Sequence, residues 1–430
     1  MESKIEIRPA NGPVDFSIRP PGSKSISNRA LICAALAAGK STLSEILVSD
    51  DTRVMLDSLQ KLGIAVTLDE PNCSATIFGC GGQLPNPTAE LFVDNSGTTI
   101  RFLTGMLGLH GGKFRLSGAP RMHERPIGPL AEALNQLGAK ITTQSDGGCP
   151  PVAIDSARIA EGTCKVAGDI SSQYASGLML ASPLAAGNFQ IQLLPPIVSK
   201  PYLLMTQQVM KQFGVESSIS LAEEPTCFSL VAGQTYQPLD YAIEPDASAA
   251  SYFWATAAIC GGNATVIGLN KDSLQGDVGF AHCLEQMGCN VKWESDRITV
   301  SGKARRGIDI DMADISDTVQ TLAAVALFVS GPTRVRGVAH NRVKETDRIG
   351  NLAIELRKLG AIVNEHEDGL TIAPGKLQSA EIETYNDHRM AMSLSLPGLV
   401  QAGVAIKDPG CTSKTYPNFF EDLDKAVNNQ

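Results

Sequence analysis

The chain has 430 residues, which exceeds the size of one ordinary hydrophobic core and predicts two domains or one large repeat architecture. Hydrophobic residues make up 43% of the chain and charged residues 19%, a composition that is typical of globular proteins and excludes a disordered or fibrous chain. The formal net charge of −9 argues against nucleic acid or an anionic membrane as a partner, because both are bound through basic surfaces. Any anionic ligand must therefore be held by local positive charge.

The start of the chain and the cysteines indicate a compartment. Residues 1–21 lack the basic segment and apolar stretch of an export signal, and no apolar run approaches the roughly 20 residues that span a bilayer. The ten cysteines include no CxxC pair and lie mostly in apolar segments, which is typical of reduced thiols rather than of disulfides or metal ligands. The sequence thus predicts a soluble, unexported, cytoplasmic protein with no metal and no organic cofactor.

The first predicted helix begins at Ser25, beside Lys24, and continues as an apolar run that ends at Gly39. Five later segments repeat this form, with Ser, Asp or Asn in the first positions, an apolar middle and a final Gly. Side chains of this kind accept hydrogen bonds from the free N–H groups at a helix start, and Gly commonly follows a helix end. Because a helix that is apolar on nearly every side must be buried, the pattern predicts buried helices that begin near residues 25, 96, 171, 246, 315 and 386.

A second set of helices, amphipathic and followed by Gly and a short strand, alternates with the first set. The glycines that end them are spaced by 75, 76, 74 and 72 residues, at Gly63, Gly138, Gly214, Gly288 and Gly360. Such regular spacing is typical of duplicated structural units. A sixth amphipathic helix, residues 418–427, ends the chain without its strand. The sequence therefore predicts six α/β units, arranged as two domains of three.

Basic residues gather at the predicted helix starts. A helix N-terminus carries roughly half a positive charge and unpaired N–H groups, so several converging N-termini form an anion site. The starts of the buried helices contain Lys24, Arg29, Arg101, Gln173, Asp317 and Arg389, and the loops before the amphipathic helices add Arg125, Lys200, Lys344, Arg348 and Lys414. This distribution favours a strongly anionic ligand bound between two domains.

Several motifs admit a structural as well as a functional interpretation. Residues 34–41, AALAAGKS, match a loose phosphate-loop pattern, but that loop needs a helix that opens at its Lys, and we interpret GKS as a helix end. Asp317 is interpreted first as a helix N-cap, with proton acceptance as the alternative. Residues 341–348, NRVKETDR, form either a solvated helix start or a site where a Lys and a carboxylate act as acid and base. Arg389 suits a carboxylate or phosphate, whereas His388 lacks metal-site spacing.

Eight motifs in order along the chain resemble one known family. The segments PGSKSISNRA, NSGTTIR, ERPIG, DISSQ, SKPY, VKETDR, YNDHRMAM and CTSKTYP resemble those of the 5-enolpyruvylshikimate-3-phosphate synthases, the target family of the herbicide glyphosate. The resemblance covers nearly the whole chain. It implies two inside-out α/β domains, each of three repeated units with buried parallel helices. Residues 22–242 would form one domain, mainly on the shikimate-phosphate side, and residues 1–21 with 243–430 would form the other, completing an interdomain cleft.

The resemblance also implies a reaction and its substrates. The family transfers the enolpyruvyl group of phosphoenolpyruvate to the 5-hydroxyl of shikimate 3-phosphate in chorismate and aromatic amino-acid biosynthesis, by addition and elimination through a tetrahedral intermediate. By motif match, the residues for shikimate 3-phosphate would be Lys24, Ser25, Arg29, Ser171, Ser172, Gln173, Ser199, Tyr202, Asp317, Asn341 and Lys344. Those for phosphoenolpyruvate would be Lys24, Asn95, Gly97, Thr98, Arg125, Gln173, Arg348, Arg389 and Lys414.

The resemblance further implies catalytic roles. Asp317 and Lys344 would handle the proton of the 5-hydroxyl group, Glu345 would transfer a proton at the methylene carbon, and Lys24 would be a fourth catalytic residue. The chain departs from glyphosate-sensitive members, which commonly carry Ala, Met and Pro where this chain has Thr99, Ile100 and Phe102. No metal or cofactor is implied, and a monomer is expected.

Other functions remain as alternatives. The sister enolpyruvyl transferase that acts on UDP-N-acetylglucosamine carries a reactive Cys shortly before an Arg-Pro pair, but the corresponding segment here, residues 118–126, contains none. A non-catalytic anion-binding repeat protein would tolerate the same basic residues. An RNA phosphate cyclase would need a nucleotide site and a more basic face, which the sequence does not support.

Overall fold

The protein is described by a computed structural model that covers residues 3–221 and 226–428. The chain forms two compact units, which we call the terminal unit (Met1–Pro21 with Glu244–Gln430) and the central unit (Gly22–Ile243). Ile243 lies with the central unit, one residue later than the expected boundary, because its backbone N–H group donates a hydrogen bond of 3.0 Å to the Ser44 carbonyl oxygen.

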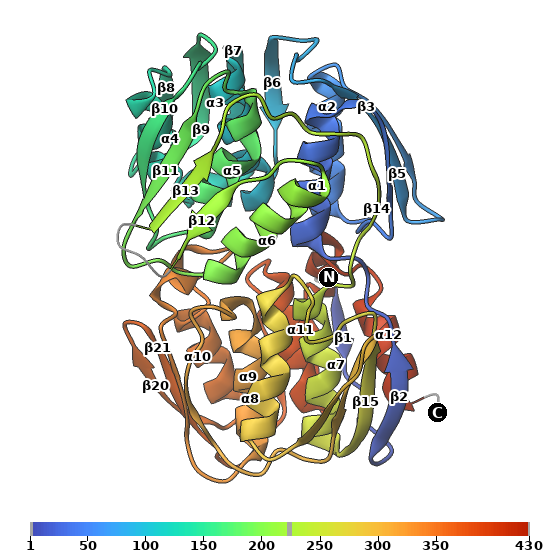
Figure 1. The fold of residues 1–430 in the computed structure, drawn as a ribbon. Helices are drawn as coiled ribbons and strands as arrows, with labels where there is room; N and C mark the ends of the chain where they lie inside the picture. Colours follow the sequence, from blue (N-terminus) through green and yellow to red (C-terminus); the bar gives the residue numbers. More distant parts are fainter. Residues whose placement is uncertain (1–2, 222–225, 429–430) are drawn as a thin grey trace. The chain divides into compact units, whose positions relative to one another are not determined.

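The central unit is built from helices and four-stranded mixed sheets (Figure 1). Its α-helices are α1 (Lys24–Leu36), α2 (Asp50–Lys61), α3 (Gly97–His110), α4 (Gly128–Gln136), α5 (Ser172–Ala181) and α6 (Lys200–Gln212). The first sheet has the strand order β14 (Asp240–Ala242), β3 (Ala38–Ser44), β5 (Ser74–Cys80) and β4 (Ala65–Asp69). The second has the order β6 (Thr88–Phe92), β7 (Gly112–Ser117), β9 (Cys149–Ser156) and β8 (Ile141–Ser145). The third has the order β10 (Gly162–Ala167), β11 (Phe189–Leu194), β13 (Thr226–Leu230) and β12 (Ser218–Ser220).

The terminal unit repeats this plan. Its α-helices are α7 (Ala247–Cys260), α8 (Phe280–Gln286), α9 (Val319–Val325), α10 (Gly350–Lys358), α11 (His388–Ser395) and α12 (Phe419–Asn428). The first sheet has the strand order β16 (Asn290–Trp293), β17 (Arg297–Ser301), β15 (Gly262–Ile267) and β2 (Val14–Ile18). The second has the order β18 (Asp309–Asp311), β19 (Thr333–Arg336), β21 (Gly369–Ala373) and β20 (Ile362–His366). The third has the order β1 (Lys4–Glu6), β23 (Val404–Lys407) and β22 (Ala380–Ile382).

Each sheet contains one parallel pair of strands, and its other pairs are antiparallel. The parallel pairs are β14 with β3, β6 with β7, β10 with β11, β2 with β15, β18 with β19, and β22 with β23. In every pair the second strand follows a buried helix, and an amphipathic helix and two antiparallel strands come next along the chain. In the last unit the amphipathic helix α12 is present, but the single strand β1 takes the place of the two antiparallel strands. The mixed α/β fold of repeated units that the sequence predicted is therefore confirmed.

Two strands are exchanged between the repeats at the chain crossovers. β2 directly precedes α1 in the sequence, yet it pairs with β15 of the terminal unit. β14 directly precedes α7, yet it pairs with β3 of the central unit. Each unit therefore includes a strand that the sequence places next to the other unit's first helix.

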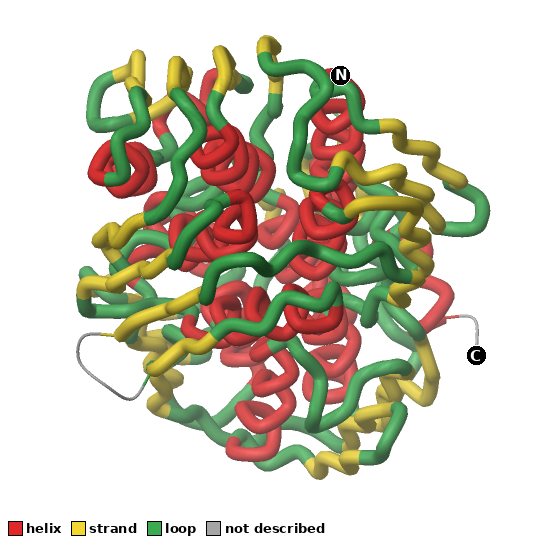
Figure 2. The backbone as a smooth tube through the Cα atoms, turned by 45° about the horizontal axis from the view of Figure 1, so that its top comes forward, coloured by secondary structure: helices red, strands yellow, loops and turns green. Residues whose placement is uncertain are grey.

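The apolar helices are enclosed by the strands of their own unit, as Figures 1 and 2 show. In α7 every residue from Ala247 to Cys260 is buried. The side chains of Ser23, Ser96, Ser171, Asp246 and Asp387 accept a backbone hydrogen bond at the starts of α1, α3, α5, α7 and α11. These caps satisfy N–H groups that lack a partner within the helix. Local sequence thus sets where these helices begin.

Two sequence interpretations need correction. Asp317 is not an N-cap: it lies inside the 3-10 turn η4 (Ser316–Thr318), and α9 begins only at Val319. Its carboxylate instead pairs with arginines, as described below. The GKS segment, Gly39 to Ser41, lies within β3 and not at the end of a helix. Since a strand and not a helix contains Lys40, the phosphate-loop alternative is excluded.

Helices α3 and α5 pack closely against each other in the central unit (Figure 1). A Cβ atom at Gly105 of α3 would lie 2.6 Å from the carbonyl oxygen of Gly177 in α5. Real Cβ atoms do not approach oxygen this closely, so the two helices can touch only because both positions lack a side chain. The first turns of the two helices contain several of the predicted site residues.

Candidate active site

Arg125 lies against the first turn of α3 in the central unit. Its Nη1 atom donates to the carbonyl oxygen of Asn95 at 2.8 Å and to Asn95 Oδ1 at 3.1 Å. A Cβ atom at Gly97 would lie 2.4 Å from Arg125 Nη2, so the missing side chain at Gly97 makes room for the guanidinium group. Both Asn95 and Arg125 are buried. Three residues of the predicted phosphoenolpyruvate set are thus in mutual contact.

Gln173 connects the first turns of α5 and α3. Its Nε2 atom donates to Thr98 Oγ1 at 3.1 Å, and its Oε1 atom accepts from Arg101 Nη1 at 2.6 Å. The neighbouring Ser171 caps α5 by accepting from the Gln173 backbone N–H group, and Ser172 is buried beside it. Hydroxyl, amide and guanidinium groups are therefore concentrated at two adjacent helix N-termini, an arrangement suited to phosphate or carboxylate oxygens.

Arg29 of α1 is a buried cation held by neutral groups. Its Nε atom donates to Thr206 Oγ1 at 2.7 Å, Nη2 donates to Ser176 Oγ at 3.2 Å, and Nη1 donates to the Ser25 carbonyl oxygen at 2.8 Å. The guanidinium carbon lies 5.1 Å from the ring centre of Phe102 and 5.8 Å from that of Tyr202.

The electrostatics of Arg29 favour an anionic ligand. Burial lowers the pKa of Arg29 to about 10. Among the residues that the structure describes, no carboxylate pairs with this guanidinium group. A buried cation without a counter-ion is costly, and an added anion would reduce that cost.

The remaining predicted residues of the central unit lie at helix starts. Lys24 is the first residue of α1, and its Nζ atom lies 3.6 Å from Asp51 Oδ2. Ser199 is the N-cap residue of α6, is buried, and has a left-handed backbone with φ 54°. Asp51 was not identified from the sequence, because its position in the first turn of amphipathic α2 is also that of an ordinary helix-start carboxylate.

In the terminal unit, Arg348 joins three carboxylates. It contacts both oxygens of Asp387, with Nε to Oδ2 at 2.7 Å and Nη2 to Oδ1 at 3.1 Å. Nη1 lies 3.2 Å from Asp317 Oδ1, and Nη2 lies 2.8 Å from Glu345 Oε2. Burial by itself lowers the pKa of Arg348, but the carboxylates of Asp387, Glu345 and Asp317 together raise it above its ordinary value.

The same cluster contains the other predicted cations. Asp317 Oδ2 lies 2.7 Å from Arg389 Nη2, so Asp317 bridges two arginines. Glu345 Oε1 lies 3.4 Å from Lys414 Nζ. Residues that are 72 and 97 positions away from Asp317 in the sequence, Arg389 and Lys414, thus share one charge network with it.

Asn341 and Lys344 lie in and just after the 3-10 turn η6 (Ala339–Val343). Asn341 is fully buried, and its side-chain Nδ2 group donates to the Ser316 backbone carbonyl oxygen at 3.0 Å. The backbone carbonyl oxygen of Asn341 accepts from the Arg348 backbone N–H group at 3.1 Å. Lys344 lies close enough to His340 for its charge to lower the pKa of that imidazole. Glu345 and Arg348 are buried, so the solvated-helix interpretation of residues 341–348 is wrong for these two side chains.

Sequence reasoning missed three residues of this cluster. Asp387 caps α11 and binds Arg348 with both oxygens, and its position in the YNDHR motif was the available signal. Tyr252, in the middle of apolar α7, accepts from Arg389 Nη1 at 3.4 Å. Asp277 lies near Asp317 but in a loop with no motif, and therefore only the fold could reveal it.

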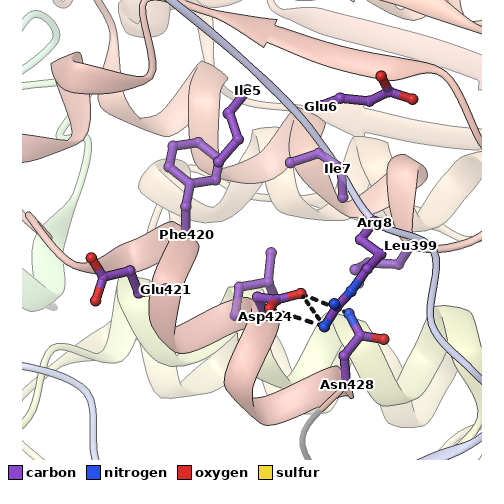
Figure 3. Close-up of a pocket in the computed structure, with 10 residues that line it drawn as sticks. Ile5, Glu6, Ile7, Arg8, Leu399, Phe420, Glu421, Asp424 and Asn428 are labelled. Atoms are coloured by element: carbon purple, nitrogen blue, oxygen red, sulfur yellow. Dashed lines mark hydrogen bonds and ion pairs between the residues drawn. The ribbon is translucent and has the colours of Figure 1, made fainter.

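A separate pocket of about 270 Å³ lies in the terminal unit between β1 and α12 (Figure 3). Its floor is apolar, with Ile7 and Leu423 buried, and Arg8 pairs with Asp424 at its edge. It contains none of the predicted site residues. The chemistry predicted from the sequence is therefore not located there.

The described residues form neither a metal site nor a membrane-spanning helix. In residues 3–221 and 226–428, no three His, Cys, Asp or Glu side chains are grouped as a metal site would require. No helix in the same described ranges has both the length and the apolar character to cross a bilayer. All ten cysteines are free thiols, and seven of them are buried.

Comparison with known proteins identifies relatives over nearly the full length. A family model described as EPSP synthase (3-phosphoshikimate 1-carboxyvinyltransferase) matches residues 9–423. A 3-phosphoshikimate 1-carboxyvinyltransferase of Nostoc punctiforme is 46% identical over 417 residues, which is 97% of each chain. The enzyme of the same name from Shewanella sediminis is 45% identical over 423 residues, or 98% of each chain.

Solved structures show the same fold. An EPSP synthase from Acinetobacter baumannii superimposes with a TM-score of 0.82 at 27% identity, covering 99% of this chain and 98% of the other. The enolpyruvyl transferase NikO from Streptomyces tendae has a TM-score of 0.75 at 18% identity, covering 100% of this chain and 98% of the other, and shows likeness of fold alone.

Proposed function

Because this chain belongs to the EPSP synthase (3-phosphoshikimate 1-carboxyvinyltransferase) family, we propose how its own residues carry out the reaction of that family. The enzyme transfers the enolpyruvyl group of phosphoenolpyruvate to the 5-hydroxyl of shikimate 3-phosphate and releases phosphate, in the shikimate pathway. This function is supported over the UDP-N-acetylglucosamine and non-catalytic alternatives, since the family model and the named relatives all carry this activity. Its substrates are two small, strongly anionic molecules.

The observation that supports the residue assignment best is the ion-pair network around Asp317. Asp317 accepts from both Arg348 and Arg389, and Glu345 lies between Arg348 and Lys414. Ion pairs in these positions hold both carboxyl groups in a fixed orientation, which a group that takes up or gives a proton to the substrate needs. The neighbouring cations are suited to a phosphate and a carboxylate of phosphoenolpyruvate.

The substrate sets are proposed as follows. Shikimate 3-phosphate is bound by Lys24, Ser25, Arg29, Ser171, Ser172, Gln173, Ser199, Tyr202, Asp317, Asn341 and Lys344. Phosphoenolpyruvate is bound by Lys24, Asn95, Gly97, Thr98, Arg125, Gln173, Arg348, Arg389 and Lys414. The contacts of Gln173 with Thr98 and of Arg125 with Asn95 support the grouping within the central unit.

In the addition step, Asp317 takes up the proton that leaves the 5-hydroxyl group, and the Lys344 ammonium group stabilises the negative charge that develops on the oxygen. The freed oxygen bonds to the second carbon of phosphoenolpyruvate, while Glu345 gives a proton to the methylene carbon and makes it a methyl group. In the elimination step, the carbon–oxygen bond to phosphate breaks and Glu345 takes a methyl proton back. Lys24 and the arginines stabilise the charge that develops at the central carbon and on the departing phosphate.

Three further properties are proposed with this function. The central and terminal units act as the two domains of the enzyme, the protein works as a monomer, and it is located in the cytoplasm. The free thiols support the compartment, because disulfides are rare in the cytosol. The resemblance to the family supports the domains and the monomer.

The direct test is phosphate release from phosphoenolpyruvate with shikimate 3-phosphate, beside a reaction with UDP-N-acetylglucosamine. Turnover is expected only with the shikimate compound. Asp317→Asn should lower kcat by about a hundredfold or more, whereas Asp309→Asn, at an exposed ion pair with Arg336, should leave it unchanged. Near-normal turnover by Asp317→Asn would remove the role of Asp317.

The role of Glu345 is tested by isotope exchange. In heavy water the reaction passes through a methyl group, so deuterium should enter the vinyl position of the product. Glu345→Gln should slow this incorporation by about the hundredfold to ten-thousandfold that general acid–base catalysis contributes. Incorporation at the unaltered rate would show that another residue moves this proton.

A further inference from the structure

Asp277 is a buried carboxylic acid that none of the assignments above uses. It lies in the 3-10 turn η3 (Gly276–Gly279) of the terminal unit, and only 3% of its surface is exposed. Its Oδ2 atom accepts a hydrogen bond from the Ser248 hydroxyl group in the first turn of α7. Gln275 fixes the same turn, since Oε1 accepts from the Ala247 N–H group at 3.0 Å and Nε2 donates to the Pro245 carbonyl oxygen at 2.7 Å. The carboxyl group is therefore held at the start of α7.

The same helix also reaches Arg389. Ser248 and Tyr252 are four residues apart, so they lie on one face of α7, one turn from each other. Arg389 Nη1 lies 3.4 Å from the Tyr252 hydroxyl oxygen, and Arg389 Nη2 lies 2.7 Å from Asp317 Oδ2. Helix α7 thus holds Asp277 through Ser248 and Arg389 through Tyr252, and the charges of Asp317 and Arg389 both act on the pKa of Asp277.

The charges around Asp277 disfavour its ionised form. Burial and then the Asp317 carboxylate raise the pKa of Asp277 to about 7, with a further contribution from Asp246 at the N-cap of α7. The Ser248 hydrogen bond and the Arg389 charge act in the opposite direction. Asp277 therefore carries a proton below neutral pH and loses it above neutral pH.

We propose that Asp277 is a positioning residue for enolpyruvyl transfer that acts through Arg389 and Asp317. While Asp277 carries its proton, Asp317 is the carboxylate that pairs with Arg389 beside the bound phosphoenolpyruvate. When Asp277 loses the proton, a second carboxylate competes for Arg389 and repels the anionic substrate. This inference rests on the proposed function, in which Arg389 binds phosphoenolpyruvate and Asp317 accepts a proton.

The inference predicts a specific pH dependence. The KM for phosphoenolpyruvate should rise about tenfold, the equivalent of one pKa unit, as the pH rises from about 6 to about 8. In the Asp277→Asn variant, the side chain can still accept from Ser248 but cannot ionise, so this rise should be absent. The ionisation of phosphoenolpyruvate itself is the same for both proteins, and the difference between the two profiles therefore belongs to Asp277.

The experiment is a pH series of kcat and KM for wild type, Asp277→Asn, Ser248→Ala and the control Asp272→Asn, an exposed position in the same loop. Ser248→Ala removes a bond that lowers the pKa of Asp277, so the rise in KM should move to higher pH. Asp272→Asn should behave as wild type. A variant that only loses packing would have altered values of kcat and KM at every pH, but the rise in KM would occur at the same pH as in wild type.

The outcomes separate the inference from the proposed function. If wild type releases no phosphate from the two substrates, the proposed function fails. If wild type turns over and its KM profile is the same as that of Asp277→Asn, the role of Asp277 is overturned. If Asp277→Asn does not fold, the decision rests on Ser248→Ala, where an unshifted profile overturns the role equally.

Discussion

The Tyr385 hydroxyl group donates a hydrogen bond of 2.7 Å to Glu355 Oε1 and so ties the turn before α11 to the middle of α10. Glu355 is fully buried, and its Oε2 atom also accepts from the Glu383 backbone N–H group at 3.1 Å. The turn needs this support, because Tyr385 and Asn386 both adopt left-handed backbone conformations, with φ of 54° and 53°. It leads directly into the residues that bind Arg348 and Asp317.

Breaking this support should weaken substrate binding and stability together. In Glu355→Ala the turn loses both hydrogen bonds, and the hydroxyl group of the half-buried Tyr385 loses its partner, at a cost of about 3 kcal/mol in the free energy of unfolding. Tyr385→Phe removes only one of the two bonds and should cost about 1 kcal/mol. Chemical denaturation measures both values. Equal costs for the two variants would show that the bond to the Glu383 backbone contributes nothing.

Arg29→Lys should impair the binding of shikimate 3-phosphate. A lysine ammonium group cannot satisfy Thr206, Ser176 and the Ser25 carbonyl oxygen from one position, because it lacks the planar fork of arginine. We expect the KM for shikimate 3-phosphate to rise about thirtyfold, or roughly 2 kcal/mol, with a smaller effect on the KM for phosphoenolpyruvate.

The control for Arg29 is Arg115→Lys, which alters an exposed arginine of β7 in the same unit and should change neither constant. A selective rise in the KM for phosphoenolpyruvate in Arg29→Lys would contradict the assignment of Arg29 to shikimate 3-phosphate.

Gly97→Ala should displace Arg125. The new Cβ atom would come within 2.4 Å of Arg125 Nη2, and the guanidinium group must move away from Asn95 to relieve the overlap. The KM for phosphoenolpyruvate should rise about tenfold, the loss expected for one hydrogen bond of a charged group. Gly128→Ala is a matched control, because the nearest atom to its Cβ would be 3.4 Å away. An unchanged KM in Gly97→Ala would show that Arg125 does not contact this substrate.

The buried His340 should make the protein less stable in acid. Burial and then the charge of Lys344 lower the pKa of His340 to about 3 in the folded protein. The unfolded chain, with an ordinary imidazole near pKa 6.5, binds a proton that the folded chain does not bind as the pH falls. The free energy of unfolding should therefore be highest above about pH 6.5 and fall by on the order of 4 kcal/mol as the pH drops toward 3.

Denaturation curves across this pH range measure the contribution of His340. In His340→Gln the free energy of unfolding should depend less on pH, because glutamine does not titrate. A variant whose stability falls as steeply as that of wild type would assign the acid sensitivity to other groups.

The sequence by itself determined the local features and the family. Capping residues such as Ser96 and Asp246, and the regular glycines after the amphipathic helices, mark helix boundaries through bonds within a few residues of each other. The eight motifs were sufficient to identify the reaction, because they cover nearly the whole chain in order. Caps, glycines and motifs can be recognised from the sequence because each depends on residues that are close together in the chain.

Only the tertiary structure decided the long-range pairings. β2 and β14 each pair with a strand of the unit that does not contain the helix following them in the sequence. Asp317 forms ion pairs with two arginines and does not cap a helix. Asp277 and Glu355 show no motif, and their importance appears only when burial and distant partners are known. The physical reason is that the energy of a buried charge depends on groups that the fold brings close in space, and sequence spacing carries no record of that proximity.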